Sequence, residues 1–277
     1  MFKAGNFSFP LGQKTYIMGI LNYTPDSFSD GGKYNSREKA LSHALELESQ
    51  GADIIDLGAN STRPGANILD EKEELQRLKD AFDALENKIS VPLSVDTFYP
   101  ACAEYALNHG AVIINDVSGT FNNEIAQLVK KFNGAYIVTH NPCGADNVID
   151  YPNSIVFAVR EFFDKCINDA EKIGLCLDNL CLDMGLGFGK TNYENYELVR
   201  RINELKYDSI ALLAGASRKR MTNINGNTPP VERDIATGAI HSLCIMGGAD
   251  IIRVHNVPMA IKYAGAADAV CRLKNNG

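Results

Sequence analysis

Three features are missing from this 277-residue chain, and each absence excludes a class of protein. The apolar runs reach only about six residues, far short of the roughly 20 that a membrane-spanning helix needs. The 27 Lys and Arg residues form no basic stripe and are outnumbered by 34 Asp and Glu, which argues against nucleic acids and anionic membranes as partners. The first residues lack the apolar core of a signal peptide, so we expect a cytoplasmic protein.

Metal-binding spacing is also missing from the cysteines and histidines. The seven cysteines are scattered and include no C-x-x-C pair, and the five histidines contain no H-x-x-x-H motif. We therefore expect reduced thiols in place of a zinc centre or a disulfide framework. His43, His109 and His241 fall within or at the ends of expected helices and are interpreted as structural.

What is present is the composition of a folded protein, with 45% hydrophobic and 22% charged residues. The length permits either two ordinary domains or one large α/β barrel. Eight short apolar runs are bounded by Gly, Pro, Asn or Asp, and their continuous apolarity is typical of parallel strands buried on both faces. The runs are Tyr16–Leu21, Asp53–Leu57, Leu93–Val95, Val112–Ile114, Tyr136–Val138, Leu180–Leu182, Ile210–Ala214 and Ile251–Val254.

Segments with one-sided helical periodicity lie between these runs, for example over residues 75–85, 159–170 and 235–243. Capping-box spacing supports helix starts after Asp70 and Thr191, and Pro258 fits the first turn of a closing helix. Eight strand-helix units predict an α/β fold, a (β/α)₈ TIM barrel in one domain over residues 15–277, with residues 1–14 capping its bottom. An open doubly wound sheet is the alternative, but no glycine fingerprint follows the first strand.

The active site of such a barrel lies at the carboxyl ends of its strands, where polar residues follow almost every run. One group is rich in acceptors and suits a ligand edge with several N–H donors, such as an aminopyrimidine. The other is rich in donors and suits phosphate or carboxylate. The acceptors are Asp56, Asp96, Asn115 and Asp183, and the donors are Arg63, Lys219, Arg253 and His255. Together they predict a site for an amino-heterocycle that carries an anionic group, whereas Asp116 and Arg218 are interpreted as loop ties.

Four expected loops, over residues 22–35, 58–69, 139–153 and 215–231, are longer than ordinary connections and are candidate lids. The first contains Phe28 and Asp30 in a run rich in Asp, Ser and Gly. The glycines between Gly185 and Lys190 do not match the frame of a phosphate-binding loop. We expect a tight turn there that places Phe188 at the mouth.

At these residues the sequence closely resembles the dihydropteroate synthase family of the folate pathway, from Met18 to about Val257. The matching motifs follow in order along the chain. They are Met-Gly-Ile-Leu-Asn at 18–22, Thr-Pro-Asp-Ser-Phe-Ser-Asp-Gly-Gly at 24–32, Ser-Thr-Arg-Pro-Gly at 61–65, Ser-Val-Asp-Thr at 94–97, Ile-Ile-Asn-Asp-Val-Ser-Gly at 113–119, Gly-Phe-Gly-Lys at 187–190, Ser-Arg-Lys at 217–219 and Arg-Val-His at 253–255.

The resemblance implies a transferase that condenses 6-hydroxymethyl-7,8-dihydropterin pyrophosphate with p-aminobenzoate, with Mg²⁺ as cofactor and a homodimer as the assembly. It implies catalytic roles for Asp96, Asp183 and Lys219. By motif, the expected ligand contacts are Asp96, Asn115, Asp183 and Lys219 for the pterin; Asn22, Arg63, Arg253 and His255 for the pyrophosphate; Thr62, Pro64, Phe188 and Ser217 for p-aminobenzoate; and Asn22 for Mg²⁺. The loop with Phe28 and Asp30 would close over them.

The chain departs from the usual family pattern at Asn60, Met184, Arg220 and the segment 139–141, where the family usually has Glu, Pro, Ser and a Met-His pair. Two other functions share parts of the pattern. A non-catalytic pterin-binding paralogue would be expected to lose the first-loop residues, which are intact. A methyltetrahydrofolate-binding methyltransferase barrel would not need the pyrophosphate-binding residues, which are present.

Overall fold

Eight parallel strands close into a barrel in the computed structural model of the chain, which describes residues 1–23, 32–60, 69–85, 87–144 and 147–272. Each strand pairs with the next along the chain, and the last pairs with the first. The strands are β3 (Tyr16–Asn22), β4 (Ile54–Gly58), β5 (Leu93–Asp96), β6 (Ile113–Asp116), β7 (Ala135–Thr139), β8 (Leu180–Asp183), β9 (Ala211–Ala214) and β10 (Ile251–Val254). The predicted (β/α)₈ barrel is confirmed, and the strand ends differ from the prediction by only a residue or two.

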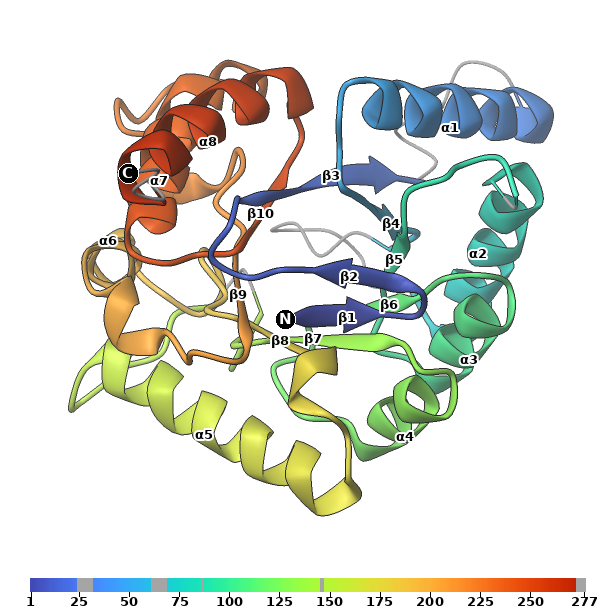
Figure 1. Cartoon of the computed structure of the whole chain (residues 1–277). Helices are drawn as coiled ribbons and strands as arrows, with labels where there is room; N and C mark the ends of the chain where they lie inside the picture. Colours follow the sequence, from blue (N-terminus) through green and yellow to red (C-terminus); the bar gives the residue numbers. More distant parts are fainter. Residues whose placement is uncertain (24–31, 61–68, 86, 145–146, 273–277) are drawn as a thin grey trace, which may run out of the picture.

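Helices surround the barrel and cover its outer face (Figure 1). They are α1 (Gly32–Ser49), α2 (Glu71–Leu85), α3 (Pro100–Asn108), α4 (Asn123–Lys131), α5 (Ile155–Ile173), α6 (Asn192–Arg200), α7 (Asp234–Met246) and α8 (Val257–Cys271). The predicted capping box is present at Thr191, whose hydroxyl accepts from Glu194 N. The first expected loop is shorter than predicted, because α1 begins at Gly32. No helix within these described ranges is long and apolar enough to cross a membrane.

Alternate residues of each strand point to opposite sides of the barrel wall, as the pleat of a strand requires. On β7, for example, Tyr136 and Val138 belong to the cluster between barrel and helices, whereas Ala135 and Ile137 belong to the cluster that fills the barrel interior. The strands are therefore buried on both sides, which explains their continuous apolarity in the sequence.

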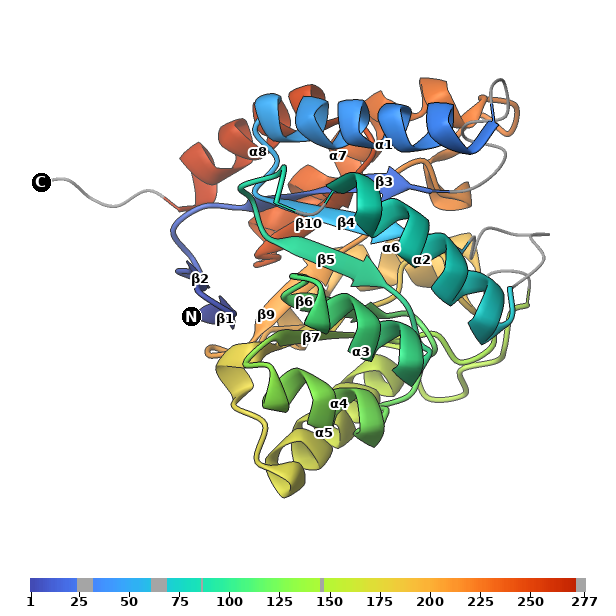
Figure 2. The same ribbon diagram turned by 90° about the vertical axis from the view of Figure 1, so that its right-hand side faces the viewer.

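A short antiparallel hairpin of β1 (Phe2–Ala4) and β2 (Phe7–Phe9) lies at the end of the barrel opposite the carboxyl ends of the strands (Figure 2). Phe2, Ala4 and Phe9 join the interior cluster, and the Phe9 ring meets the Tyr16 ring edge-on at 4.9 Å. This hairpin could not be predicted from the sequence, because strands of three residues are too short to show a period.

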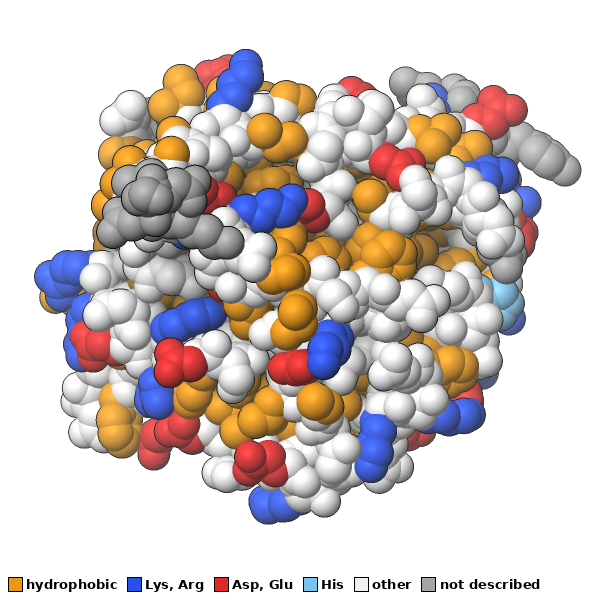
Figure 3. Space-filling model, in the orientation of Figure 1, with side chains coloured by type: hydrophobic (Ala, Val, Ile, Leu, Met, Phe, Trp, Pro, Cys, Tyr) orange, Lys and Arg blue, Asp and Glu red, His pale blue; other side chains and the backbone are white. Residues whose placement is uncertain are grey.

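The face that carries the hairpin shows Lys and Arg interspersed with Asp and Glu, with no field of one sign (Figure 3). All seven cysteines are free, and Cys102, Cys166, Cys181 and Cys244 are buried.

Candidate active site

A cavity of about 530 Å³ opens at the carboxyl ends of the strands. It is lined by side chains from strand ends and from the loops after β8 and β9. Seven of the predicted site residues line it: Asn22, Asp96, Phe188, Ser217, Lys219, Arg253 and His255. Asn115 and Asp183 are buried and are not among the lining residues. The remaining predicted lid and binding residues, namely Phe28, Asp30, Thr62, Arg63 and Pro64, lie outside the described residues.

The floor of the site is a hydrogen-bonded group built on the buried carboxylate of Asp56. Its two oxygens accept from Ser94 Oγ at 2.6 Å and from Asn115 Nδ2 at 3.1 Å. Arg253 donates from Nε to Asp56 Oδ2 at 2.5 Å and from a terminal nitrogen to Asp96 Oδ2 at 2.8 Å. The donor and acceptor groups expected from the sequence are therefore interleaved, because Arg253 lies between two floor carboxylates.

Burial shifts the ionisation of the floor carboxylates. It raises the pKa of Asp96 to about 7, although the nearby Arg253 guanidinium acts in the opposite direction. Burial also raises the pKa of Asp183, whose carboxylate accepts from Gly185 N at 2.8 Å. A methyl group built on Gly215 would lie 3.8 Å from both Asp183 Oδ2 and Lys219 Nζ. Gly215 therefore lies beside both charged groups, at the distance of an ordinary van der Waals contact.

Lys219 connects the floor to the loop after β8. Its ammonium group donates to Leu186 O at 2.5 Å and lies 4.2 Å from the centre of the Phe188 ring. Burial lowers the pKa of Lys219 to about 8, so the amine holds its proton less firmly than an exposed lysine. Phe188 is at the mouth, as predicted, and its ring faces a cation.

Lys190 holds this loop in shape, a role that was not predicted from the sequence. Its Nζ is buried and donates to three backbone oxygens, those of His140 at 3.0 Å and of Gly185 and Phe188 at 2.8 Å. Gly185 has a φ of 66°, and a Cβ there would lie 1.9 Å from His140 O. The loop therefore requires glycine at residue 185. The signal in the sequence was a lysine directly after a glycine-rich turn.

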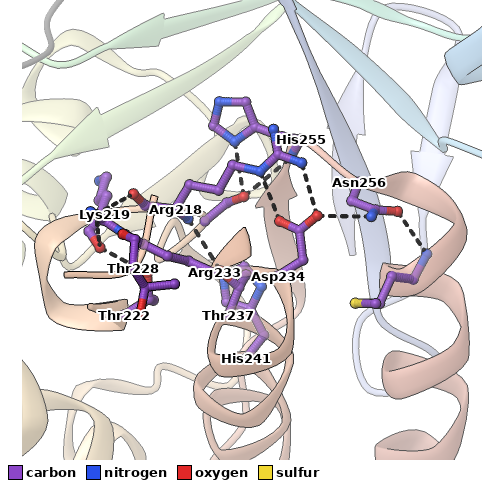
Figure 4. A network of polar contacts seen from close by, with 12 residues as sticks. Arg218, Lys219, Thr222, Thr228, Arg233, Asp234, Thr237, His241, His255 and Asn256 are labelled. Carbon is purple, nitrogen blue, oxygen red and sulfur yellow. Dashed lines mark hydrogen bonds and ion pairs between the residues drawn. The ribbon is translucent and has the colours of Figure 1, made fainter. Parts of the chain in front are cut away.

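Arg218 ties the loop after β9 to α7, as predicted. Its guanidinium makes two hydrogen bonds of 2.8 Å to the carboxylate of Asp234, which also accepts from Asn256 Nδ2 at 2.9 Å (Figure 4). Ser217 Oγ lies 2.9 Å from His255 Nδ1. This network fixes the two strand ends that carry Ser217 and His255 at the rim of the cavity.

Three positions at which the chain departs from the usual family pattern have defined surroundings. Asn60 donates to the buried Glu74 carboxylate at 2.9 Å and accepts from Leu69 N at 3.2 Å. Met184 is fully buried, and Arg220 lines the cavity. The contact between Asn60 and Glu74 could not be predicted from the sequence, because it joins the segment after β4 to α2, 14 residues further along.

The described residues offer cavity-facing oxygen atoms for a cation but no cluster of three or more His, Cys, Asp or Glu side chains arranged for a metal ion. Asn22, at the end of β3, lines the cavity with a neutral amide. Amide oxygens are hard ligands of the kind that Mg²⁺ accepts when substrate phosphates supply the others.

Comparison with known proteins gives the same family along almost the whole chain. Residues 18–255 match the pterin binding enzyme family. The dihydropteroate synthase of Synechocystis sp. is 41% identical over 273 residues, covering 97% of this chain and 94% of that protein. The dihydropteroate synthase of Clostridium beijerinckii is 39% identical over 272 residues, covering 98% and 99%.

Solved structures agree with the sequence relatives. A Clostridium difficile dihydropteroate synthase crystallised in the presence of pteroic acid has a TM-score of 0.90 and 39% identity, covering 96% of this chain and 100% of that chain. A Burkholderia cenocepacia dihydropteroate synthase complexed with 7,8-dihydropteroate has a TM-score of 0.86 and 32% identity, covering 97% and 95%. With its closed barrel and its polar cavity at the strand ends, the chain belongs to the pterin binding enzyme family, among the dihydropteroate synthases.

Proposed function

We propose that this chain condenses 6-hydroxymethyl-7,8-dihydropterin pyrophosphate with p-aminobenzoate, giving 7,8-dihydropteroate and pyrophosphate. The observation that carries the proposal is the composition of the cavity. Asp96, Lys219 and Arg253 line it, and the buried side chains of Asp56, Asn115 and Asp183 belong to the group of charged and polar residues around them. A ligand with an amino-pyrimidine edge and an anionic leaving group satisfies both kinds of side chain.

The reaction needs charge stabilisation more than a nucleophilic side chain. The bond between the pterin methylene carbon and the pyrophosphate oxygen breaks with its electrons on oxygen, which leaves positive charge on the pterin. The amine of p-aminobenzoate then forms the new C–N bond and loses one proton. Fixed carboxylates beside the ring and cations beside the leaving group would stabilise the two separating charges.

Within this reaction we assign catalytic roles to Asp96, Asp183 and Lys219, which with Asn115 bind the pterin. Arg253 would assist the leaving group only by exchanging one carboxylate partner for a phosphate oxygen. The remaining assignments follow the motifs: Asn22, Arg63, Arg253 and His255 for the pyrophosphate, Thr62, Pro64, Phe188 and Ser217 for p-aminobenzoate, and the loop of Phe28 and Asp30 as a lid that excludes water.

We further propose that Mg²⁺ accompanies the pyrophosphate and that the Asn22 amide oxygen contributes to its site. When bound, the ion would neutralise charge on the leaving pyrophosphate. The support is the hard oxygen of Asn22 at the cavity wall, beside space for the phosphates. We expect EDTA to abolish turnover and Mg²⁺ to restore it. Full activity of the chelated enzyme would contradict this assignment.

One assay tests the function itself. Pyrophosphate release is followed with the pterin substrate, with and without p-aminobenzoate. We expect release that depends on p-aminobenzoate, and at least about a 100-fold loss of kcat in Asp96→Asn, which removes one charge from the floor. Tight binding of the pterin without turnover would instead indicate a non-catalytic paralogue, and wild-type turnover in Asp96→Asn would refute the electrostatic role.

We also propose that the protein resides in the cytoplasm, whose reducing environment suits seven free cysteines. There, we propose, two copies associate through α7. Ile235, Leu243 and Met246 are exposed by 79%, 54% and 56%, and their spacing places them on one face of the helix. Leu243→Glu should convert a dimer to a monomer in sedimentation equilibrium. Leu45→Glu on α1, where the leucine is 42% exposed, should not. A monomeric wild type would contradict the proposal.

A further inference from the structure

Ser217 and Lys219, two residues of the proposed site, lie in a strained turn that follows β9. A hydrogen bond of 3.2 Å from Lys219 N to Ala216 O closes the turn. Its third residue, Arg218, has a φ of 58°. This left-handed conformation is unfavourable for an arginine and persists only where neighbouring groups hold it. The groups that bind the backbone of the turn therefore decide where its two site residues lie.

Helix α7 binds this backbone through two acceptors that lie one helical turn apart, Thr237 and His241 (Figure 4). Thr237 Oγ1 accepts from Arg218 N at 3.1 Å, and His241 Nε2 accepts from Ala216 N at 3.0 Å. Ala216 lies two residues beyond Ala214, the last residue of β9. Its amide is thus outside the strand ladder and needs an acceptor from elsewhere, which the imidazole of His241 supplies.

The second nitrogen of the imidazole orients the ring. His241 Nδ1 lies 3.0 Å from Tyr263 Oη on α8. Because Nε2 accepts a hydrogen bond, the neutral ring carries its proton on Nδ1 and donates it to the tyrosine oxygen. Burial lowers the pKa of His241 to about 3, so the ring stays neutral and Nε2 stays an acceptor near neutral pH.

Packing alone does not explain a histidine at this position of α7. The side chain of His241 is completely buried, and an apolar side chain would fill the space without the cost of burying an imidazole. The tyrosine that orients it is also closely fitted, because a Cβ at Gly238 would lie 2.8 Å from Tyr263 Cδ1. Tyr263, His241 and Ala216 thus form one hydrogen-bonded series that ends at the turn.

We propose that His241 is a positioning residue for the condensation, which sets the turn of Ser217 and Lys219 by accepting from Ala216 N. The inference rests on the proposed function and gives a histidine that was interpreted as structural a part in the reaction. His241 is not among the described residues that line the cavity. It therefore acts through the backbone and not by contact with a substrate.

Two amide substitutions separate the two contacts of the imidazole. His241→Gln can place its side-chain oxygen near the position of Nε2 and so keep an acceptor for Ala216 N. His241→Asn is one bond shorter and reaches only the position of Nδ1, beside Tyr263. We expect His241→Asn to lower kcat about 10-fold, because Lys219 moves with the turn, and His241→Gln to stay within about 3-fold of the wild type. Steady-state kinetics with both substrates measure the difference.

Amide hydrogen exchange measures the contact independently of turnover. The Ala216 amide should be protected in the wild type and in His241→Gln, and it should exchange faster in His241→Asn. Unchanged exchange in His241→Asn would refute the contact. Faster exchange with wild-type kinetics would refute the positioning role, as would equal kinetic losses in the two variants. A wild type without turnover but with a protected Ala216 amide would instead refute the proposed function on which this role depends.

Asn179→Leu is the control for a general loss of stability. The buried Asn179 amide donates to Lys3 O at 2.9 Å and to Gly134 O at 2.8 Å, at the end of the barrel that carries the hairpin. Its melting temperature should fall at least as far as that of His241→Asn, because two carbonyl groups lose their donor, while kcat stays constant. A loss of kcat that both variants share would identify an effect of instability and overturn the inference.

Discussion

Two residues of the cavity, Asp96 and Lys219, have pKa values close to neutrality, which predicts a narrow pH optimum. The proposed roles need Asp96 as a carboxylate and Lys219 as an ammonium ion. The pKa of Asp96 is about 7 and that of Lys219 about 8. As the pH rises, Asp96 therefore gains its carboxylate form and Lys219 loses its ammonium form. We expect kcat/KM for the pterin substrate to rise with pH through about 7 and to fall above about 8. Initial rates at low substrate concentration across this range measure both limbs.

Variants of the same residues assign the limbs. Lys219→Arg keeps a positive charge at all accessible pH values and should remove the alkaline limb from whatever activity remains. Asp96→Asn should remove the acidic limb. A wild-type profile that is flat from about pH 6 to about pH 9 would be incompatible with these roles.

The positions of the floor residues could be predicted from the sequence, but their pairing could not. Asp96 and Asp183 follow apolar runs, and the ends of parallel strands in a barrel converge on one mouth. Whether Arg253 lies apart from the carboxylates or between them depends on side-chain conformation and on strands that are distant in sequence. For the same reason the sequence could not show that the Thr139 hydroxyl has no hydrogen-bond partner among the residues that the structure describes.

At the scale of elements, the loop after β8 owes its shape to one glycine and one buried lysine. We expect Gly185→Ala to lower the free energy of unfolding by about 3 kcal/mol or more, through left-handed backbone strain and a clash with His140 O. KM for p-aminobenzoate should also rise, because the loop carries Phe188. Urea denaturation and steady-state kinetics measure the two effects.

Gly226→Ala is the control for backbone strain alone. Gly226 has a φ of 82°, but a Cβ there would meet nothing within 4 Å. We expect a loss of about 1 kcal/mol and unchanged kinetics. Equal destabilisation by the two substitutions would show that the contact with His140 is unimportant.

Helices and strands with a clear hydrophobic period or a local capping signal were predicted well, and those without such a signal were not. The capping box at Thr191 and the proline at the start of α8 are local signals, and both fixed a helix start correctly. The start of α1 at Gly32 was missed, since a glycine-rich run gives no helical signal. The loop segments with Phe28 and Arg63 remain predictions, because they lie outside the described residues.

At the scale of the whole molecule, we expect the amino-terminal hairpin to stabilise the barrel without taking part in catalysis, consistent with a capping segment over residues 1–14. Phe2 is fully buried against the interior cluster. Phe2→Ala should lower the free energy of unfolding by about 3 kcal/mol or more. Below the unfolding transition kcat/KM should be unchanged, because the cavity lies at the other end.

Phe157→Ala on α5 is the matched control, since that ring is 49% exposed and its removal should change the free energy of unfolding by less than about 1 kcal/mol. If Phe2→Ala were as mild as the control, the hairpin would be dispensable for stability.

The fold as a whole could be predicted because eight strand-helix units repeat, each with its own pattern of burial. The hairpin joins the fold only through tertiary contacts.

The amino-terminal hairpin affects the order in which substrates bind and products leave. Because Phe2, Ala4 and Phe9 fill the lower end of the barrel, we expect substrates to enter and products to leave at the carboxyl ends of the strands, where the described residues form the cavity. If the pterin binds at the floor and p-aminobenzoate near Phe188, as proposed, we expect the pterin to bind first and the product to leave before the next pterin binds. The fold therefore favours ordered binding of the two substrates over random binding.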